Sequence, residues 1–208
     1  MRVINILALS LSLALPAAAA ERVLDTSRAA QGVRIVVIEA GVGEITVTGD
    51  STGTITAHVE LTPKSGFWGS RGQRAIDTAE LEPVLRGDTL SLRVGPRDDD
   101  HKFGEDWTVH VPPDVAVKIE LGVGDVKVLD TTGDIDVDLG VGDVRIEGEY
   151  RAFGPIHASS GVGDAALRTP EGREDGDGFI GHSLRGRGPG KSSINTSTGV
   201  GDSQIRLR

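Results

Sequence analysis

Four aspartates that each follow the same tripeptide are the residues best suited to chemistry. The sequence Gly-Val-Gly-Asp occurs four times, and its aspartates are Asp125, Asp143, Asp164 and Asp202. Carboxylates repeated beside glycine turns could stack and supply the oxygen ligands that Ca²⁺ requires. These four aspartates are therefore the candidate metal ligands of the chain, and calcium is its one candidate cofactor.

The Gly-Val-Gly-Asp sequence, called the tetrad below, also has a structural interpretation. The sequence favours this interpretation over a calcium site. Calcium-binding β-rolls of the repeat-in-toxin type read Gly-Gly-x-Gly-x-Asp. The present repeat lacks the glycine pair, and its aspartate follows glycine directly. Glycine can instead supply a turn with positive φ, while the aspartate caps that turn through its own backbone. The valine between the two glycines is then expected to point inward and fill the corner.

No arrangement in the chain predicts catalytic residues, so we expect a protein that is not an enzyme. The acids Asp134, Asp136 and Asp138 share one face of a predicted strand. A glycoside hydrolase needs two carboxylates that face each other across a cleft, and an exposed acidic ladder is the simpler interpretation. A carbohydrate-active enzyme on a β-helix stays as the second alternative function, after a calcium-binding repeat protein.

The elements that position these residues are short strands, because apolar residues recur with a period of two almost throughout. In the second half a unit of one strand and one turn repeats about every nine residues, from Gly124 to Gly133 to Gly142. Two such units would form one coil of a β-solenoid or roll. The predicted inward set is Val126, Val128, Ile135, Val137, Val144 and Ile146. Lys127 is expected to lie beside Arg145, with Asp136 on the other face.

Three segments lack this alternation and predict exposed loops. They are Gly66 to Gln73, Arg97 to Asp106, and the glycine-rich stretch from Thr169 to Ser193, which could also be a degenerate coil. The segment from Gln73 to Leu85 carries a weak helical pattern and is interpreted as strand and loop at least as readily. Arginines alternate with Ile205 and Leu207 at the end of the chain, which is typical of a protected edge strand.

The first twenty residues predict a secretory signal peptide. Arg2 precedes a short apolar run from Ile6 to Leu15, and small residues up to Ala20 form a cleavage site. No later run approaches the roughly 20 apolar residues of a membrane helix. We therefore expect an exported protein of the periplasm or cell surface that does not span a membrane. The net charge of −9 argues against nucleic-acid partners.

The stretch from Trp107 to Val128, WTVHVPPDVAVKIELGVGDVKV, resembles the bacterial putative-adhesin family of exported β-strand-repeat proteins. The resemblance runs from about Val33 to Arg208. It implies a solenoid-like stack behind a sheet-rich N-terminal part, and it brings no catalytic residues.

Together these observations predict an all-β protein with a signal peptide (1–20), an N-terminal β-rich portion (21–115) and a β-solenoid portion (116–208) that continues it as one domain. The expected function is structural or adhesive, with an unidentified partner in the envelope or on a surface. Self-association through an exposed strand edge is a further expectation.

Overall fold

The computed structural model describes residues 21–63, 75–95, 103–176 and 181–208. The predicted signal peptide, the predicted loop from Gly66 to Gln73 and most of the predicted loop from Arg97 to Asp106 lie outside these residues. The end of that last segment belongs to a strand, because β6 begins at Phe103. Residues 75–78 are helical and are followed at Glu80 by a strand, so the segment predicted as strand and loop contains both a helical turn and a strand.

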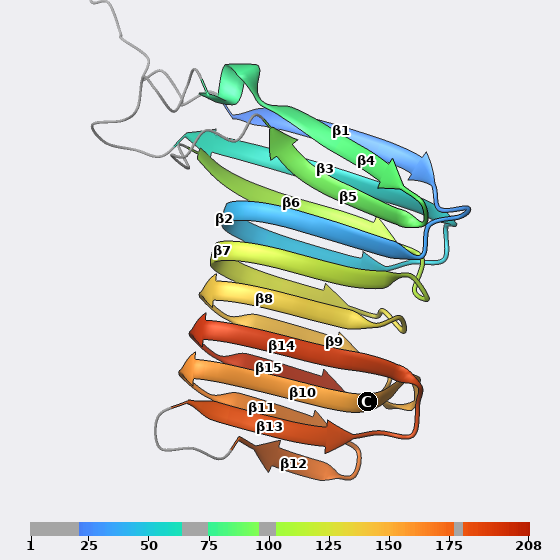
Figure 1. Ribbon diagram of the computed structural model, residues 1–208, viewed down its shortest axis with the longest axis vertical. Helices are drawn as coiled ribbons and strands as arrows, with labels where there is room; N and C mark the ends of the chain where they lie inside the picture. Colours follow the sequence, from blue (N-terminus) through green and yellow to red (C-terminus); the bar gives the residue numbers. More distant parts are fainter. Residues whose placement is uncertain (1–20, 64–74, 96–102, 177–180) are drawn as a thin grey trace, which may run out of the picture.

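The described chain is all-β, and its strands form one large mixed sheet (Figure 1). The strands are β1 (Arg22–Ala29), β2 (Ile35–Gly49), β3 (Thr54–Pro63), β4 (Glu80–Arg86), β5 (Thr89–Gly95), β6 (Phe103–Val111), β7 (Ala116–Leu129), β8 (Ile135–Val141), β9 (Val144–Gly148), β10 (Phe153–Val162), β11 (Ala165–Thr169), β12 (Gly172–Asp175), β13 (His182–Arg187), β14 (Ser192–Val200) and β15 (Ser203–Leu207). A short 3₁₀ helix, Tyr150–Ala152, leads into β10. The all-β prediction is confirmed, and the sheet that the structure shows is unclosed.

The sheet folds over at the glycine corners, so that it forms two layers with the apolar residues between them (Figure 1). The long strands β2 and β7 run through a corner, and their two halves pair with different neighbours. The pairs β8 and β9, β10 and β11, and β14 and β15 each place one strand in each layer. We call each such two-stranded piece, and each of the bent strands β2 and β7, an arch.

The predicted inward residues of the repeat all belong to the core. The six side chains from Val126 to Ile146 that the alternation selects are buried. Lys127 lies opposite Arg145, as predicted, and Asp136 lies on β8 in the other layer. The alternation works because successive side chains of a strand point to opposite faces. A single buried cluster, which includes Trp107 and Phe153, continues through both predicted portions of the chain.

The order of the arches in space differs from their order in the sequence. The last arch, β14 and β15, lies between the arch β8/β9 and the arch β10/β11. All of these contacts are parallel. The C-terminal strand is therefore an internal strand, and the prediction of a protected edge at Ile205 and Leu207 is wrong.

Of the two interpretations of Thr169 to Ser193, the long loop is wrong for the residues that the structure describes, and the degenerate coil stays a prediction. β12 pairs antiparallel with β11, and β13 pairs antiparallel with β10. Because β13 runs antiparallel to β10, it brings the chain back to the end of the sheet at which β10 begins. The next strand, β14, can therefore run parallel to β10. β14 then enters on the opposite edge of β10. The segment has no clear alternation because it forms short outermost strands with exposed charges.

Candidate functional site

The second glycine of each tetrad forms a corner that no other residue can occupy without strain. Gly124, Gly142, Gly163 and Gly201 have φ between +132° and +135°. A Cβ atom on Gly142 would lie 1.8 Å from the carbonyl oxygen of Gly124 in the next arch. The glycines thus allow neighbouring arches to touch through their backbones. The sequence correctly predicted a turn with positive φ, and the structure adds this close approach between arches.

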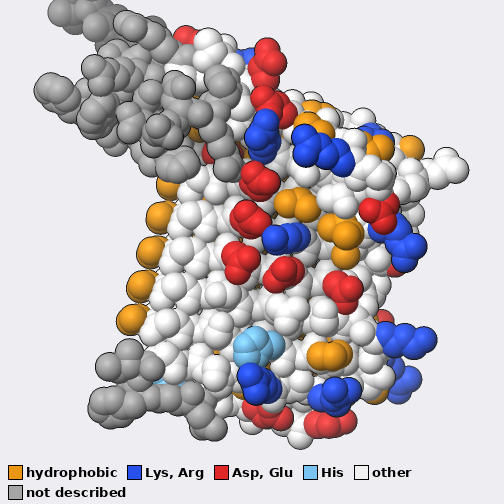
Figure 2. All heavy atoms as spheres, in the orientation of Figure 1, with side chains coloured by type: hydrophobic (Ala, Val, Ile, Leu, Met, Phe, Trp, Pro, Cys, Tyr) orange, Lys and Arg blue, Asp and Glu red, His pale blue; other side chains and the backbone are white. Residues whose placement is uncertain are grey.

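The valine of each tetrad points outward, which corrects the prediction of an inward corner filler. The exposed fractions of Val123, Val141 and Val200 are 45%, 45% and 46%, and that of Val162 is 58%. Figure 2 shows a column of apolar side chains along the left edge of the molecule, where the strands turn at the corners in Figure 1. The alternation changes phase at the positive-φ glycine, since Leu121 and Val126 on either side of the first corner are buried while Val123 between them is exposed.

The four tetrad aspartates form a ladder along this edge, in the spatial order Asp125, Asp143, Asp202, Asp164. The backbone N–H of Asp143 donates to Asp125 Oδ1 (3.1 Å). The N–H of Asp202 donates to Asp143 Oδ1 (2.9 Å), and that of Asp164 to Asp202 Oδ1 (2.9 Å). Each of these three carboxylates therefore accepts a hydrogen bond from the next arch, where the sequence had predicted a cap within the aspartate's own turn. The ladder joins residues up to 59 positions apart in sequence.

The structure places the four predicted calcium ligands along one ladder, in which three of them accept backbone hydrogen bonds. One oxygen of Asp125, Asp143 and Asp202 already accepts a backbone hydrogen bond. Within the described residues there is no group of three or more His, Cys, Asp or Glu residues that could hold a metal ion. Ca²⁺ requires six to eight oxygen ligands, roughly, around one point. Calcium binding stays a prediction. Substitutions in the ladder can distinguish a calcium ligand from an acceptor of a backbone hydrogen bond.

Replacing Asp143 by alanine is expected to lower the free energy of unfolding by about 1 kcal/mol, because the N–H of Asp202 loses its acceptor. Asp143→Asn is expected to keep most of this stability, since the amide oxygen can still accept. Urea unfolding of the three proteins, with added calcium and with a chelator, measures both effects. A calcium site would instead make asparagine nearly as damaging as alanine and would make the parent protein sensitive to the chelator.

The acids of the second predicted ladder lie on the outer face of β8, with Asp134 just before the strand. Asp134 Oδ1 accepts hydrogen bonds from the backbone N–H (2.7 Å) and hydroxyl (3.0 Å) of Ser193. The pKa of Asp136 is raised by burial and by neighbouring Asp138, while Lys118 opposes the shift. Lys118 lies directly opposite Asp136 on β7. These acids thus lie on one exposed strand face beside Lys118.

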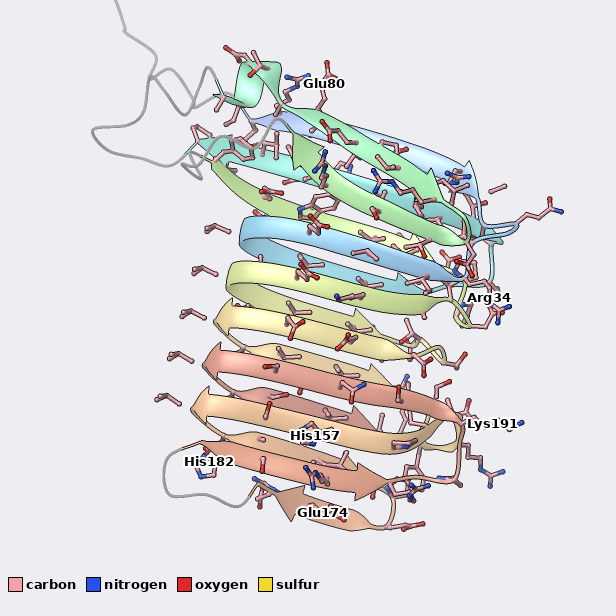
Figure 3. The ribbon with its side chains drawn as sticks, viewed as in Figure 1. Arg34, Glu80, His157, Glu174, His182 and Lys191 are labelled. Atoms are coloured by element: carbon pink, nitrogen blue, oxygen red, sulfur yellow. The ribbon has the colours of Figure 1, made fainter. Side chains whose placement is uncertain are left out.

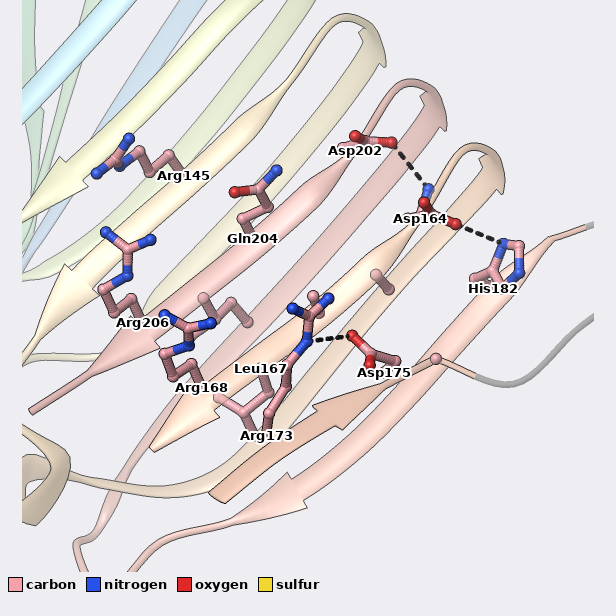
Figure 4. A pocket seen from close by; sticks show the side chains of 14 residues that line it. Arg145, Asp164, Leu167, Arg168, Arg173, Asp175, His182, Asp202, Gln204 and Arg206 are labelled. Atoms are coloured by element: carbon pink, nitrogen blue, oxygen red, sulfur yellow. Dashed lines mark hydrogen bonds and ion pairs between the residues drawn. The ribbon is translucent and has the colours of Figure 1, made fainter. Parts of the chain in front are cut away.

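A group of arginines that sequence reasoning missed lies on the outer face of β15, β11 and β12. Arg206 is opposite Arg168, and Arg168 is opposite Arg173. They border a hollow of about 540 Å³ (Figure 4). No local sequence pattern could have predicted this group. Its strands become neighbours only because the last arch lies beside β11 and because β12 pairs with the other edge of β11.

The geometry defines a class of protein: an all-β stack of arches with flat, charged outer faces. No helix in the part of the chain that the structure describes is long and apolar enough to cross a membrane. No family model and no curated protein matches the sequence.

Similarity is found among solved structures. The chain resembles a putative cell adhesion protein from Clostridium sporogenes, with 14% identity and a TM-score of 0.51, over 91% of this chain and 100% of that chain. It is also similar to a putative adhesin from Bacteroides fragilis, with 14% identity and a TM-score of 0.27, over 90% of this chain and 98% of that chain. The first similarity shows a shared fold, in agreement with the resemblance to bacterial adhesins in the sequence.

Proposed function

We propose that this chain is an exported, non-catalytic adhesive or structural protein of the cell envelope. The observation that carries the proposal is the shared fold with a putative cell adhesion protein over that protein's whole length. The predicted signal peptide supports export. The flat outer faces support a role in contact with a surface, because they present side chains in regular rows.

In this proposal residues 21–115 and 116–208 act as one continuous domain, a rigid solenoid-like stack. Three kinds of contact hold the arches together: parallel strand pairs, backbone approach at the glycine corners, and the aspartate ladder. Charged side chains stand on the outside, such as Lys127, whose Nζ lies 2.5 Å from Glu44 Oε1 on the neighbouring arch. Because exposed pairs contribute little to stability, such side chains can exchange their partners for groups on another surface.

The outermost strands of the stack suggest that the faces, more than the strand edges, make its contacts. β12 is four residues long and carries Arg173, Glu174 and Asp175, and β4 contains Pro83. Short charged strands and proline oppose pairing with a strand of another molecule. Self-association through β12 or β4 is therefore less favoured than contact through a face, and β1 and β13 remain the edges at which strand pairing between molecules would occur.

The proposed function predicts that beads coated with residues 21–208 adhere to bacterial envelope preparations or to cultured host cells. Adhesion is expected well above that of beads coated with the same protein after thermal unfolding, because the rows of side chains exist only in the folded stack. Counting bound beads by microscopy measures the effect. Equal counts for folded and unfolded coatings on every surface would reject an adhesive function.

Export is tested separately by expressing the full chain with a C-terminal tag in a bacterium. A processed protein that begins at Glu21 and is recovered outside the cytoplasm is expected. Recovery of the unprocessed chain in the cytoplasm would contradict this part of the proposal.

A further inference from the structure

The hollow on the outer face of β15, β11 and β12 combines a row of arginines with hydrogen-bonding groups. Its lining includes Arg145, Gln204, Arg206, Arg168 and Arg173. Asp175, Asp164, Asp202 and His182 also line it. Figure 4 shows the arginines along one side and Asp202, Asp164 and His182 toward the corner. Its volume of about 540 Å³ lies within the range of about 300–1,000 Å³ typical of small-molecule sites.

Three of the arginines lie directly opposite one another on adjacent strands. Arg206 faces Arg168 across a parallel pair, and Arg168 faces Arg173 across an antiparallel pair. Like charges in directly opposite positions of a sheet destabilise it. A bound anion would remove this repulsion, so the row is a place where an anion binds favourably.

Arg168, in the middle of the row, has an uncommitted guanidinium group. Arg173 pairs with Asp175 (2.8 Å), and Arg206 lies 3.5 Å from Glu147. Within the described residues the side chain of Arg168 makes no hydrogen bond or ion pair, and it is exposed. A guanidinium group offers a planar fork of donors that matches a carboxylate.

The row of residues beside the arginines consists of Gln204, Ala166 and Asp175. It leaves the face hollow and offers a ligand further polar groups. Ala166 lies between Gln204 and Asp175 in the strand register, and its small side chain leaves space in front of the sheet. Gln204 can donate and accept, and the aspartates accept hydrogen bonds from hydroxyl groups. The aspartates also repel ligands with dense negative charge, and so does the net charge of −9. The chemistry that fits is one carboxylate among several hydroxyl groups.

We propose that this hollow binds an acidic sugar, a carbohydrate ring that carries a carboxylate, within a surface glycan. The carboxylate lies on Arg168 between Arg206 and Arg173, and ring hydroxyl groups donate to Asp175 and exchange hydrogen bonds with Gln204. The inference deepens the proposed adhesive function, because it names the class of surface component that the protein contacts. It concerns binding only, and no bond of the sugar is made or broken.

Isothermal titration of residues 21–208 with tetragalacturonate tests the inference. Binding is expected, and it should weaken at least about tenfold when the carboxylates of the oligosaccharide are methyl-esterified, because each charge-assisted pair is lost. Arg168→Gln is expected to weaken binding of the acid form by a similar factor. The matched control is Arg34→Gln, which removes an equal charge from an exposed side chain at the edge of the molecule opposite His182 (Figure 3).

Several outcomes would overturn the inference. They are no binding of tetragalacturonate, equal binding of its ester, or equal affinities of the two arginine variants. Inorganic sulfate that binds as tightly as the oligosaccharide would show a simple anion site and would also overturn it. The melting temperature of Arg168→Gln is expected to equal or slightly exceed that of the parent, since a like-charge contact is removed. A lower affinity therefore cannot be assigned to unfolding.

The bead assay separates this inference from the proposed function. Coated beads that adhere while tetragalacturonate does not bind would reject the acidic-sugar site alone. Binding of tetragalacturonate by a protein whose beads adhere to no surface would reject the adhesive function and support the site.

Discussion

Replacing Gly142 by alanine is expected to destabilise the protein by about 4 kcal/mol or more, or to prevent folding, because strain and overpacking act together. Gly142 has φ +132°, which a residue with a Cβ rarely adopts. Its Cβ would also lie 1.8 Å from the carbonyl oxygen of Gly124. That atom belongs to the backbone of the neighbouring arch and cannot rotate away. Urea unfolding followed by circular dichroism measures the loss.

The control is Gly53→Ala, at a glycine with positive φ that touches no other arch. Gly53 also has a positive φ, +69°, but nothing lies within 4 Å of the position that its Cβ would occupy. Its replacement is expected to cost about 1 kcal/mol, the strain alone. If Gly142→Ala cost no more than Gly53→Ala, the close packing of the corners would be wrong. The interpretation of the tetrad as a contact between arches would then fail.

Deleting Ser192 to Arg208 is expected to separate the end of the stack from the rest. In the structure β14 pairs with β8 on one side and with β10 on the other, and β15 does the same with β9 and β11. The deletion therefore removes both neighbours that join β10 and β11 to the preceding arches. It also removes the buried Ile194 and Ile205. Hydrogen exchange is expected to show lost protection in β10, β11 and β13, while β2 and β7 stay protected.

The control for this deletion is Val200→Ser, on a strand that the deletion removes. Val200 is 46% exposed, and its substitution is expected to leave the exchange pattern unchanged. A stack in sequence order would place the last arch at the end, so the deletion would leave β10 and β11 paired with β8 and β9. Unchanged protection of β10 in the deleted protein would favour that order and contradict the insertion.

Much of the local structure was predictable because its causes lie within a few residues. Alternation selected the inward side chains, and all six predicted ones, Val126 and Ile146 among them, are buried. The glycines of the tetrad predicted turns with positive φ, which the structure shows at Gly124 and Gly142. The direction of the tetrad valines was predicted wrongly, because the alternation changes phase at the positive-φ glycine and does not continue through the corner.

The candidate sites were predictable only in part, because their residues meet through contacts between strands that are distant in sequence. The sequence showed that the tetrad aspartates repeat, and the structure shows that each of three accepts a hydrogen bond from a neighbouring arch. The arginine row was absent from the prediction, because Arg206 and Arg168 are far apart in sequence and meet only across β15 and β11.

The sequence by itself determined the all-β class, the buried face of each repeat strand and the position of each corner. These properties follow from side-chain alternation and from glycine conformation, which act between near neighbours in the chain. The tertiary structure alone decided that the last arch enters between two earlier ones, and hence which charges share a face. The physical reason is that the backbone edge of a strand can pair with a strand from any part of the sequence. β13 runs back along one edge of β10, and β14 then pairs with the other edge of β10 and with β8.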